Sequence, residues 1–454
     1  MRNLGASVLL LMCVAAMSTP AQAQFFAECS SGSKSELEQN IRAHEEHMHR
    51  LNRKLITGWY WQGPLPKSFQ PVGLAEVRSR LAQMAPRKAA ILFYAYNKQA
   101  TRLCVWLVSA TGPAISVVSP LGGVDMLRRL RPESMATLGV TTRSDPVRKK
   151  AMSKEAFDQQ MAALDQELKA LKAGPSPPPP LSALGKTLLP GEVVLAIAKE
   201  KIDTLIVIPV FDLGLIPFAA LPIGGGRMLI DDVSIVVAPG FFVFHEAQRA
   251  AKHDFAGALV VGNPYREDPE WHLARLPGAE AEAREIAAGA GVTPLIGPGA
   301  TKSAILARLR KTPHPPLIYI AAHGVADDAN PLDGGFLALS DGRWTGREIV
   351  KQVPRDSARP LVVLSACQTA LGKDFDVGTI GIARAWHEVG ASNVVMSLWL
   401  VGDRSTQLLM TRFIKFAQEA PPDKALRKAI LERRGEDPRV VAWAGFAVFG
   451  APER

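Results

Sequence analysis

The chain has 454 residues, enough for about two or three domains. Hydrophobic residues make up 47% of it and charged residues 21%, which excludes a disordered chain and predicts sizeable cores. The net charge of +10 indicates attraction to anionic surfaces or acidic partners, but the basic residues are scattered and no nucleic-acid-binding motif accompanies them, so we expect no nucleic-acid ligand.

The first 23 residues have the pattern of a secretory signal peptide. Arg2 supplies a positive start, residues 8–14 an apolar centre, and residues 21–23 (Ala-Gln-Ala) a small-residue cleavage site. Polar residues and a proline at 18–20 interrupt the apolar stretch too early for a membrane span. We therefore predict an exported protein, periplasmic or secreted, without a transmembrane segment; an uncleaved anchor is the alternative.

Residues 24–87 are predicted to form an N-terminal helical region. Apolar side chains recur at alternating spacings of four and three over residues 35–55, which is typical of a helix with a narrow apolar stripe. Residues 154–172 repeat this pattern, and the Pro-rich run that follows predicts an extended linker. We predict a helical and Pro-rich insertion at 154–180, whose helix packs against helix 35–55 or shares with it one groove for a helical partner protein.

The sequence His44-Glu45-Glu46-His47 within the first helix resembles a metal site. Its histidines are three residues apart, whereas the zinc motif H-E-x-x-H requires four. His44 also falls on the apolar stripe, so we expect a partly buried histidine and no metal.

The rest of the chain predicts an α/β domain. Residues 90–96 and 103–109 read as two strands around a turn at 97–99. Further strands are predicted at 204–210, 233–238, 257–262, 316–322, 360–366 and 393–399, and helices at 279–289, 302–310, 346–352, 379–389 and 403–418. This alternation favours a mostly parallel sheet with helices on both faces.

Two of these strands end in residues that carry chemistry. The apolar run 317–322 leads into His323 and Gly324, and the run 361–366 leads into Cys367. Sites in parallel sheets form beyond the carboxyl ends of the strands, and neighbouring strands lie about 4.8 Å apart. An imidazole there can take the proton of a thiol, and the N–H groups of Gly324 and Cys367 can hold an oxyanion. Either residue alone would more often be structural, but the paired placement favours a reactive site.

Removal of the signal peptide would leave Cys29, Cys104 and Cys367. An oxidising compartment permits one disulfide among them and leaves one thiol. We predict a Cys29–Cys104 disulfide and a free thiol at Cys367.

The motifs along the chain resemble those of the CHAT domain, a caspase-like cysteine peptidase domain related to caspases, separases and gingipains. The likeness extends from about residue 88 to 452. Its motifs follow the family's order at residues 205–209, 215–221, 262–264, 276–280, 322–324, 330–332, 364–372, 390–391, 397–403 and 443–446. Each motif is weakly specific, whereas the ordered series with both reactive residues is specific.

The resemblance implies a caspase-like fold over residues 88–452 and a cysteine endopeptidase acting on proteins or peptides. Cys367 would be the nucleophile and His323 the base and proton donor, and no cofactor or metal is implied. Separases and gingipains cut after basic residues with an acidic residue in the substrate pocket. Asp403 is accordingly our first candidate for the pocket floor, although it also suits a helix N-cap before residue 404. Further pocket candidates are Asp374, Asp376 and Gln368.

Several positions depart from the family's pattern. Ala322 stands where Thr is frequent, Gln368 where Glu is common, and residues 333–335 (Asp-Gly-Gly) replace a usual Ser. These differences bear on specificity more than on mechanism. Two other functions stay open: a catalytically silent scaffold or protein-interaction module, and a thiol redox sensor at Cys367.

Overall fold

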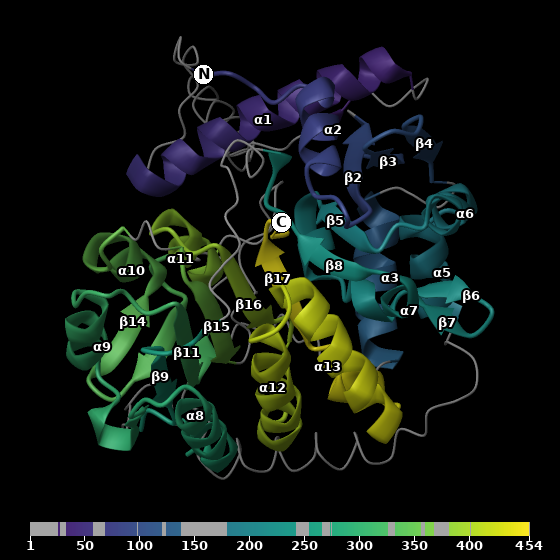
Figure 1. Cartoon of the computed structure of the whole chain (residues 1–454). Coiled ribbons are helices and arrows are strands. Elements are labelled where there is room, and N and C mark those ends of the chain that lie inside the picture. Colours follow the sequence, from purple (N-terminus) through teal and green to yellow (C-terminus); the bar gives the residue numbers. More distant parts are fainter. Residues whose placement is uncertain are drawn as a thin grey trace, which may run out of the picture.

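The computed structural model describes residues 26–27, 33–57, 69–97, 99–119, 124–137, 179–241, 254–265, 273, 275–325, 332–355, 359–366, 381–399 and 401–453. They build a 12-stranded sheet in the order β10-β9-β11-β15-β16-β17-β8-β5-β2-β3-β4, with β1 beside β2 (Figure 1). The pairing is mostly parallel and helices cover the sheet, so the predicted α/β class is confirmed.

The elements have the following bounds. The strands of the large sheet are β1 (Phe26–Ala27), β2 (Ala89–Asn97), β3 (Leu103–Ser109), β4 (Ile115–Val118), β5 (Thr204–Ile208), β8 (Ser234–Val237), β9 (Leu259–Gly262), β10 (Leu295–Ile296), β11 (Leu317–Ala322), β15 (Leu361–Ala366), β16 (Asn393–Ser397) and β17 (Phe446–Gly450). Two small sheets contain β12 (Gly324–Val325), β13 (Phe336–Leu339) and β14 (Gly342–Thr345), and β6 (Pro222–Gly224) and β7 (Arg227–Met228). The α-helices are α1 (Lys34–Thr57), α2 (Leu74–Ala82), α3 (Val124–Thr137), α5 (Pro179–Leu188), α6 (Gly191–Glu200), α7 (Leu229–Asp232), α8 (Pro277–Gly289), α9 (Lys302–Leu309), α10 (Gly346–Gln352), α11 (Ile382–Glu388), α12 (Asp403–Ala417) and α13 (Pro422–Glu436). Short 3-10 helices are η1 (Phe211–Leu215), η2 (Phe218–Ala220), η4 (Gly297–Gly299) and η5 (Val440–Ala442).

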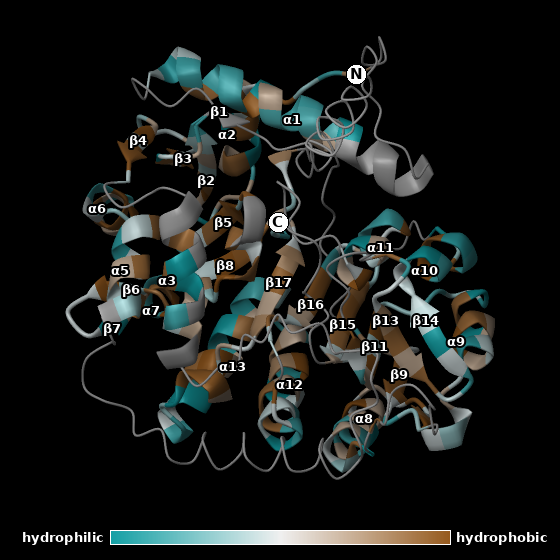
Figure 2. Ribbon diagram, turned by 180° about the vertical axis from the view of Figure 1, so that it is seen from behind, coloured by the Kyte–Doolittle hydropathy of each residue, from teal (hydrophilic) through white to brown (hydrophobic). Residues whose placement is uncertain are grey.

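The strands predicted from residue 190 onward are all observed, because their unbroken apolar runs are buried on both faces of the sheet. Every residue of β11 and of β15 is buried, as the composition of these strands requires. Figure 2 shows the same distribution over the molecule, with hydrophobic strands inside and hydrophilic helix faces outside. The strand β17 and the helix α13 before it are not among the predicted elements.

The sheet consists of two halves that run in opposite directions. Strands β9, β11, β15 and β16 are mutually parallel, whereas β17 is antiparallel to β16 and parallel to β8. Strands β8, β5 and β2 continue in the direction of β17. The carboxyl ends of β11 and β15 therefore lie at the opposite edge of the sheet from the carboxyl ends of β5 and β8.

Helix α1 occupies the predicted position of the first helix and lies along one end of the molecule, away from α8 and α12 in both views (Figures 1 and 2). The buried His44 ring packs edge-on against Phe93 and Phe241, with centroids 5.4 and 5.5 Å away. Burial lowers the pKa of His44 to about 3, so it is a neutral core side chain. Within the described residues, no three ligand-type side chains gather as a metal site would require. The predicted partner helix at 154–172 lies outside the described residues.

Cys104 on β3 is disulfide-bonded. Cys29 and Cys367 both lie outside the described residues, so the pairing of Cys104 with Cys29 stays a prediction.

No single helix of the described ranges is long and apolar enough to cross a membrane. The helices Pro180–Leu188 and Gly191–Glu200 are bent by 63° relative to each other. Only the two together have the length and apolar composition of a membrane span. The predicted signal peptide is outside the described residues.

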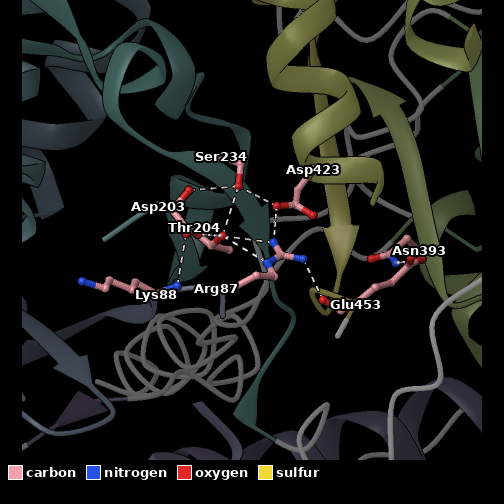
Figure 3. A network of polar contacts seen from close by, with 8 residues as sticks. All are labelled: Arg87, Lys88, Asp203, Thr204, Ser234, Asn393, Asp423 and Glu453. Atoms are coloured by element: carbon pink, nitrogen blue, oxygen red, sulfur yellow. Dashed lines mark hydrogen bonds and ion pairs between the residues drawn. The ribbon is translucent and has the colours of Figure 1, made fainter. Parts of the chain in front are cut away.

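A buried polar network surrounds the contact between β17 and β8 (Figure 3). The Arg87 side chain, before β2, contacts Asp423 of α13 at 2.5 Å, and the two side chains are only 6% and 1% exposed. Arg87 also donates to the Thr204 hydroxyl and, at 2.7 Å, to the backbone carbonyl of Glu453. Ser234 donates to Asp423 at 2.6 Å. The Arg87 guanidinium thus connects β5, α13 and the segment after β17, and Ser234 of β8 joins them through Asp423.

Arg87→Ala is expected to lower the free energy of unfolding by about 3–5 kcal/mol, because it leaves the buried Asp423 carboxylate without its cation. Chemical denaturation of the protein measures this. Arg80→Ala is the control, since it removes a more exposed pair with Glu76 and is expected to cost about 1 kcal/mol or less. Equal losses for the two variants would contradict the role given to Arg87.

Candidate active site

The site region is built on β11 and β15, which are hydrogen-bonded neighbours. Their last paired residues, Ala322 and Ala366, lie directly opposite each other. In the sequence His323 follows the first of these and Cys367 the second. The two residues that precede the predicted reactive pair are therefore held in register by the sheet itself.

The structure describes His323, Gly324 and Asp403 among the residues predicted for the site. The others lie outside the described residues; they are Cys367, Gln368, Asp374 and Asp376. Their roles stay predictions.

His323 is buried, with 7% of its surface exposed, and its backbone is fixed by a hairpin. Its carbonyl accepts a hydrogen bond from the N–H of Ala338 on β13 at 2.9 Å, and the next residue, Gly324, lies opposite Leu337. A bond at this flanking position makes Gly324 and Leu337 a non-hydrogen-bonded pair of the antiparallel ladder. The Gly324 N–H consequently points away from β13, which suits the predicted oxyanion role.

The ends of both strands are tied to their neighbours. The Ser397 hydroxyl at the end of β16 donates to the carbonyl of Ala366 at 2.6 Å. On the other side of β11, the N–H of Asn263 donates to the carbonyl of Ala321 at 2.9 Å. These bonds fix the backbone immediately before the two predicted reactive residues.

Asn263 also shapes the loop after β9. It has a left-handed backbone with φ of 45°, a conformation that asparagine tolerates better than most residues. Its side chain accepts from the N–H of Leu276 at 2.8 Å and donates to Glu280 at 3.1 Å. The motifs at 262–264 and 276–280 are therefore two sides of one hydrogen-bonded unit that starts α8.

Asp403 caps a helix, but not the one predicted. Its own helix, α12, starts after Gly402 without a side-chain cap, and the Asp403 carboxylate instead accepts from the N–H groups of Gly278 and Ala279 in α8, at 2.6 and 2.9 Å. Two first-turn N–H groups of α8 are thereby satisfied. A carboxylate has about four acceptor positions, so the predicted pocket role is compatible with this contact and remains a prediction.

Glu282 is a buried acid that the sequence reasoning missed. It lies on the sheet-facing side of α8, is 1% exposed, and accepts a hydrogen bond from the Tyr319 hydroxyl of β11. Burial raises the pKa of Glu282 to about 8, against the opposing effect of the Ser365 and Tyr319 hydroxyls. The side chain is therefore neutral at pH 7. Glu282 comes three residues after Ala279 and four before Ile286, a spacing that places it on the apolar face of the helix. This spacing is the sequence signal that could have revealed a buried acid.

Residues 178–451 match the CHAT domain family, which is more than half of the chain. The chain belongs to the CHAT domain family. Among curated proteins none matches it.

Solved structures share the fold of this CHAT protein. The separase of the Saccharomyces cerevisiae separase–securin complex superposes with a TM-score of 0.58 and 12% identity over 93% of this chain. A second structure of that complex gives a TM-score of 0.56 and 11% identity over 94% of the chain. The chain spans only 34% of the separase chain in each case. The Arg-specific cysteine proteinase gingipain R gives a TM-score of 0.40 and 11% identity over 67% of this chain and 76% of its own.

The CHAT match and the separase superposition confirm the predicted family and its caspase-like α/β fold. Within the CHAT domain, the structure explains several family motifs as supports of one sheet edge. Motif 276–280 begins α8, motif 397–403 contains the Ser397 and Asp403 contacts, and motif 322–324 surrounds His323.

Gly278→Ala is expected to destabilise the CHAT domain by about 1–3 kcal/mol, because an added Cβ would meet the Asp403 carboxylate at 2.5 Å. Thermal and chemical unfolding measure the loss. Gly289→Ala, at the other end of α8, has nothing within 4 Å of its Cβ and is the matched control, expected to be neutral or slightly stabilising. A tolerated Gly278→Ala would show that the Asp403 contact is not rigid.

Glu282 makes the folding stability depend on pH. Its folded pKa of about 8 exceeds the ordinary 4.5, so its contribution is full below pH 4.5 and is lost as the pH rises towards 8. Glu282→Gln is expected to remove up to about 3 kcal/mol of the decline in unfolding free energy between pH 4.5 and 7. Denaturant titrations across this range test it, with the exposed Glu432→Gln as control. An unchanged decline would mean that Glu282 ionises freely in the folded state.

Proposed function

We propose that this CHAT protein is an exported cysteine endopeptidase in which Cys367 is the nucleophile and His323 the general base. One observation carries the proposal: β11 and β15 are neighbours in register, and the residues before His323 and Cys367 are the last opposed pair. A thiol and an imidazole that follow such a pair start within reach of each other or of one bound substrate.

In the proposed mechanism His323 takes the thiol proton of Cys367, and the thiolate attacks the carbonyl carbon of the scissile peptide bond. The N–H groups of Gly324 and Cys367 hold the oxyanion of the tetrahedral intermediate. His323 then gives its proton to the leaving amine, which leaves a thioester on Cys367. A water molecule, deprotonated by His323, attacks the thioester; the carboxyl product departs, and the proton returns to the thiolate.

The proposed substrates are proteins or peptides cut after Arg or Lys. A basic side chain needs an acidic partner in its pocket. Asp403 is the first candidate, because it begins α12 at the same edge of the sheet. Its carboxylate also has acceptor positions beyond the two that bind α8. Asp374 and Asp376 are the alternatives, and Gln368 is a further pocket candidate directly after the nucleophile.

Export and a protein partner complete the proposal. The signal-peptide pattern of residues 1–23 and the disulfide at Cys104 both support an oxidising compartment, periplasmic or extracellular. The separase to which the chain is similar was solved with securin, which supports a protein partner for this chain as well.

Peptidyl electrophiles that differ in the residue before the cut test the function. We expect labelling of Cys367 and turnover of Arg and Lys peptides, both reduced at least about 10³-fold in Cys367→Ala and in His323→Ala. Mass spectrometry maps the adduct. His314→Ala is the matched control, since this histidine precedes the opposite end of β11 and is expected to leave turnover unchanged.

Other results would replace the proposal. Labelling of Cys367 by any thiol reagent alike, without peptide turnover, would favour the silent scaffold or the redox sensor. Turnover that survives Cys367→Ala would exclude this residue as the nucleophile.

A further inference from the structure

A buried acidic group lies directly behind the edge of the sheet that carries the site. Glu282 projects from α8 onto the face of the sheet where β11 and β15 pair, and its carboxyl group contacts the Tyr319 hydroxyl. Ser365 of β15 lies beside both groups. The carboxyl group of this α8 side chain thus binds β11 through Tyr319 and lies beside β15 at Ser365.

The distance along the chain to the reactive pair is short. Ser365 precedes Cys367 by two residues, and Ala321, which lies opposite Ser365, precedes His323 by two. Two residues of extended chain span at most about 7 Å. A movement of the Glu282 side chain would therefore reach both reactive residues through a short stretch of backbone.

The charges around Glu282 oppose its ionisation. From its own helix Glu285 and from α12 Asp403 act on it with negative charge, while β11 and β15 offer the hydroxyls of Tyr319 and Ser365. A carboxylate in this buried place is costly, and it would draw in water or shift α8. The neutral acid carries no such cost and fits the packed interface.

We propose, building on the function proposed above, that Glu282 is a positioning residue: its neutral carboxyl group holds the ends of β11 and β15 in the arrangement that Cys367 and His323 require. Loss of the proton at alkaline pH disturbs this arrangement, because the charge cannot stay dry between α8 and the sheet. A displacement of about 1 Å is enough to reduce catalysis about 10²-fold. Glu282 therefore sets the alkaline limit of the reaction.

The pH profile of kcat and KM for wild type and Glu282→Gln tests this, because glutamine has nearly the same shape and cannot ionise. We expect the two proteins to agree within about threefold at pH 7. Above pH 8 the wild-type kcat falls at least about tenfold, whereas the Glu282→Gln value is maintained and KM changes little. Tyr319→Phe is expected to move the wild-type fall to higher pH, since it removes a hydrogen bond that favours the carboxylate.

The controls separate positioning from folding. Tryptophan fluorescence at each pH verifies that the proteins stay folded, and Glu432→Gln, an equal charge change on the exposed face of α13, is expected to keep the wild-type profile. If Glu282→Gln fails to fold, the Tyr319→Phe profile decides alone. Profiles that fall at the same pH in wild type, Glu282→Gln and Tyr319→Phe would overturn the inference.

The inference is separable from the peptidase function. If wild type shows no turnover dependent on Cys367, the proposed function fails, and the rate of Cys367 alkylation by iodoacetamide is measured against pH instead. Wild-type and Glu282→Gln rates that diverge above pH 8 would support the positioning role. Rates that coincide over the whole range would overturn it.

Discussion

The buried contact between Arg87 and Asp423 closes the seam on which the rest of this fold depends. The sheet changes direction between β16 and β17, and β17 is joined on its other side to β8, so the β17–β8 contact is the seam that attaches β16 and β17 to β8, β5 and β2. At this seam one guanidinium binds the first residue of β5, the helix α13 and the chain after β17. A single charged side chain can do this because it has five donors in a fixed plane and each acceptor lies on a different element. Because β11 and β15 run opposite to β17, their carboxyl ends lie at the edge of the sheet away from α1 (Figure 1).

That edge is held by backbone contacts made by small polar groups. Ser397, Asn263 and the Asp403 carboxylate each bind backbone N–H or C=O groups of a neighbouring segment, so the strand ends and the start of α8 form one unit. Gly278 is needed there because the Asp403 carboxylate occupies the place of a side chain. Such contacts fix the backbone of the strand ends that the predicted reactive residues follow.

The sequence predicts this arrangement unevenly, for physical reasons. Apolar runs that end at His323 and Cys367 reveal the strands, since a strand buried on both faces has no polar alternation. The direction of β17 is not predictable from alternation, because two consecutive helices, α12 and α13, separate it from β16. The capping of α8 by Asp403 joins residues 125 positions apart, so the local pattern favours only a cap for its own helix. Glu282 escapes notice because a polar residue in an alanine-rich helix usually marks the solvent face.

Two acidic groups at α8 show how one helix creates opposite environments. Asp403 meets the N–H groups of the first turn and accepts two hydrogen bonds from them. Glu282 lies farther along the same helix, on its sheet-facing side, where it meets hydroxyl groups and where Asp403 itself adds repulsion. The charge that caps the helix therefore helps to keep the buried acid neutral. The same contact that positions α8 also disfavours a second negative charge behind the strands that lead to the site.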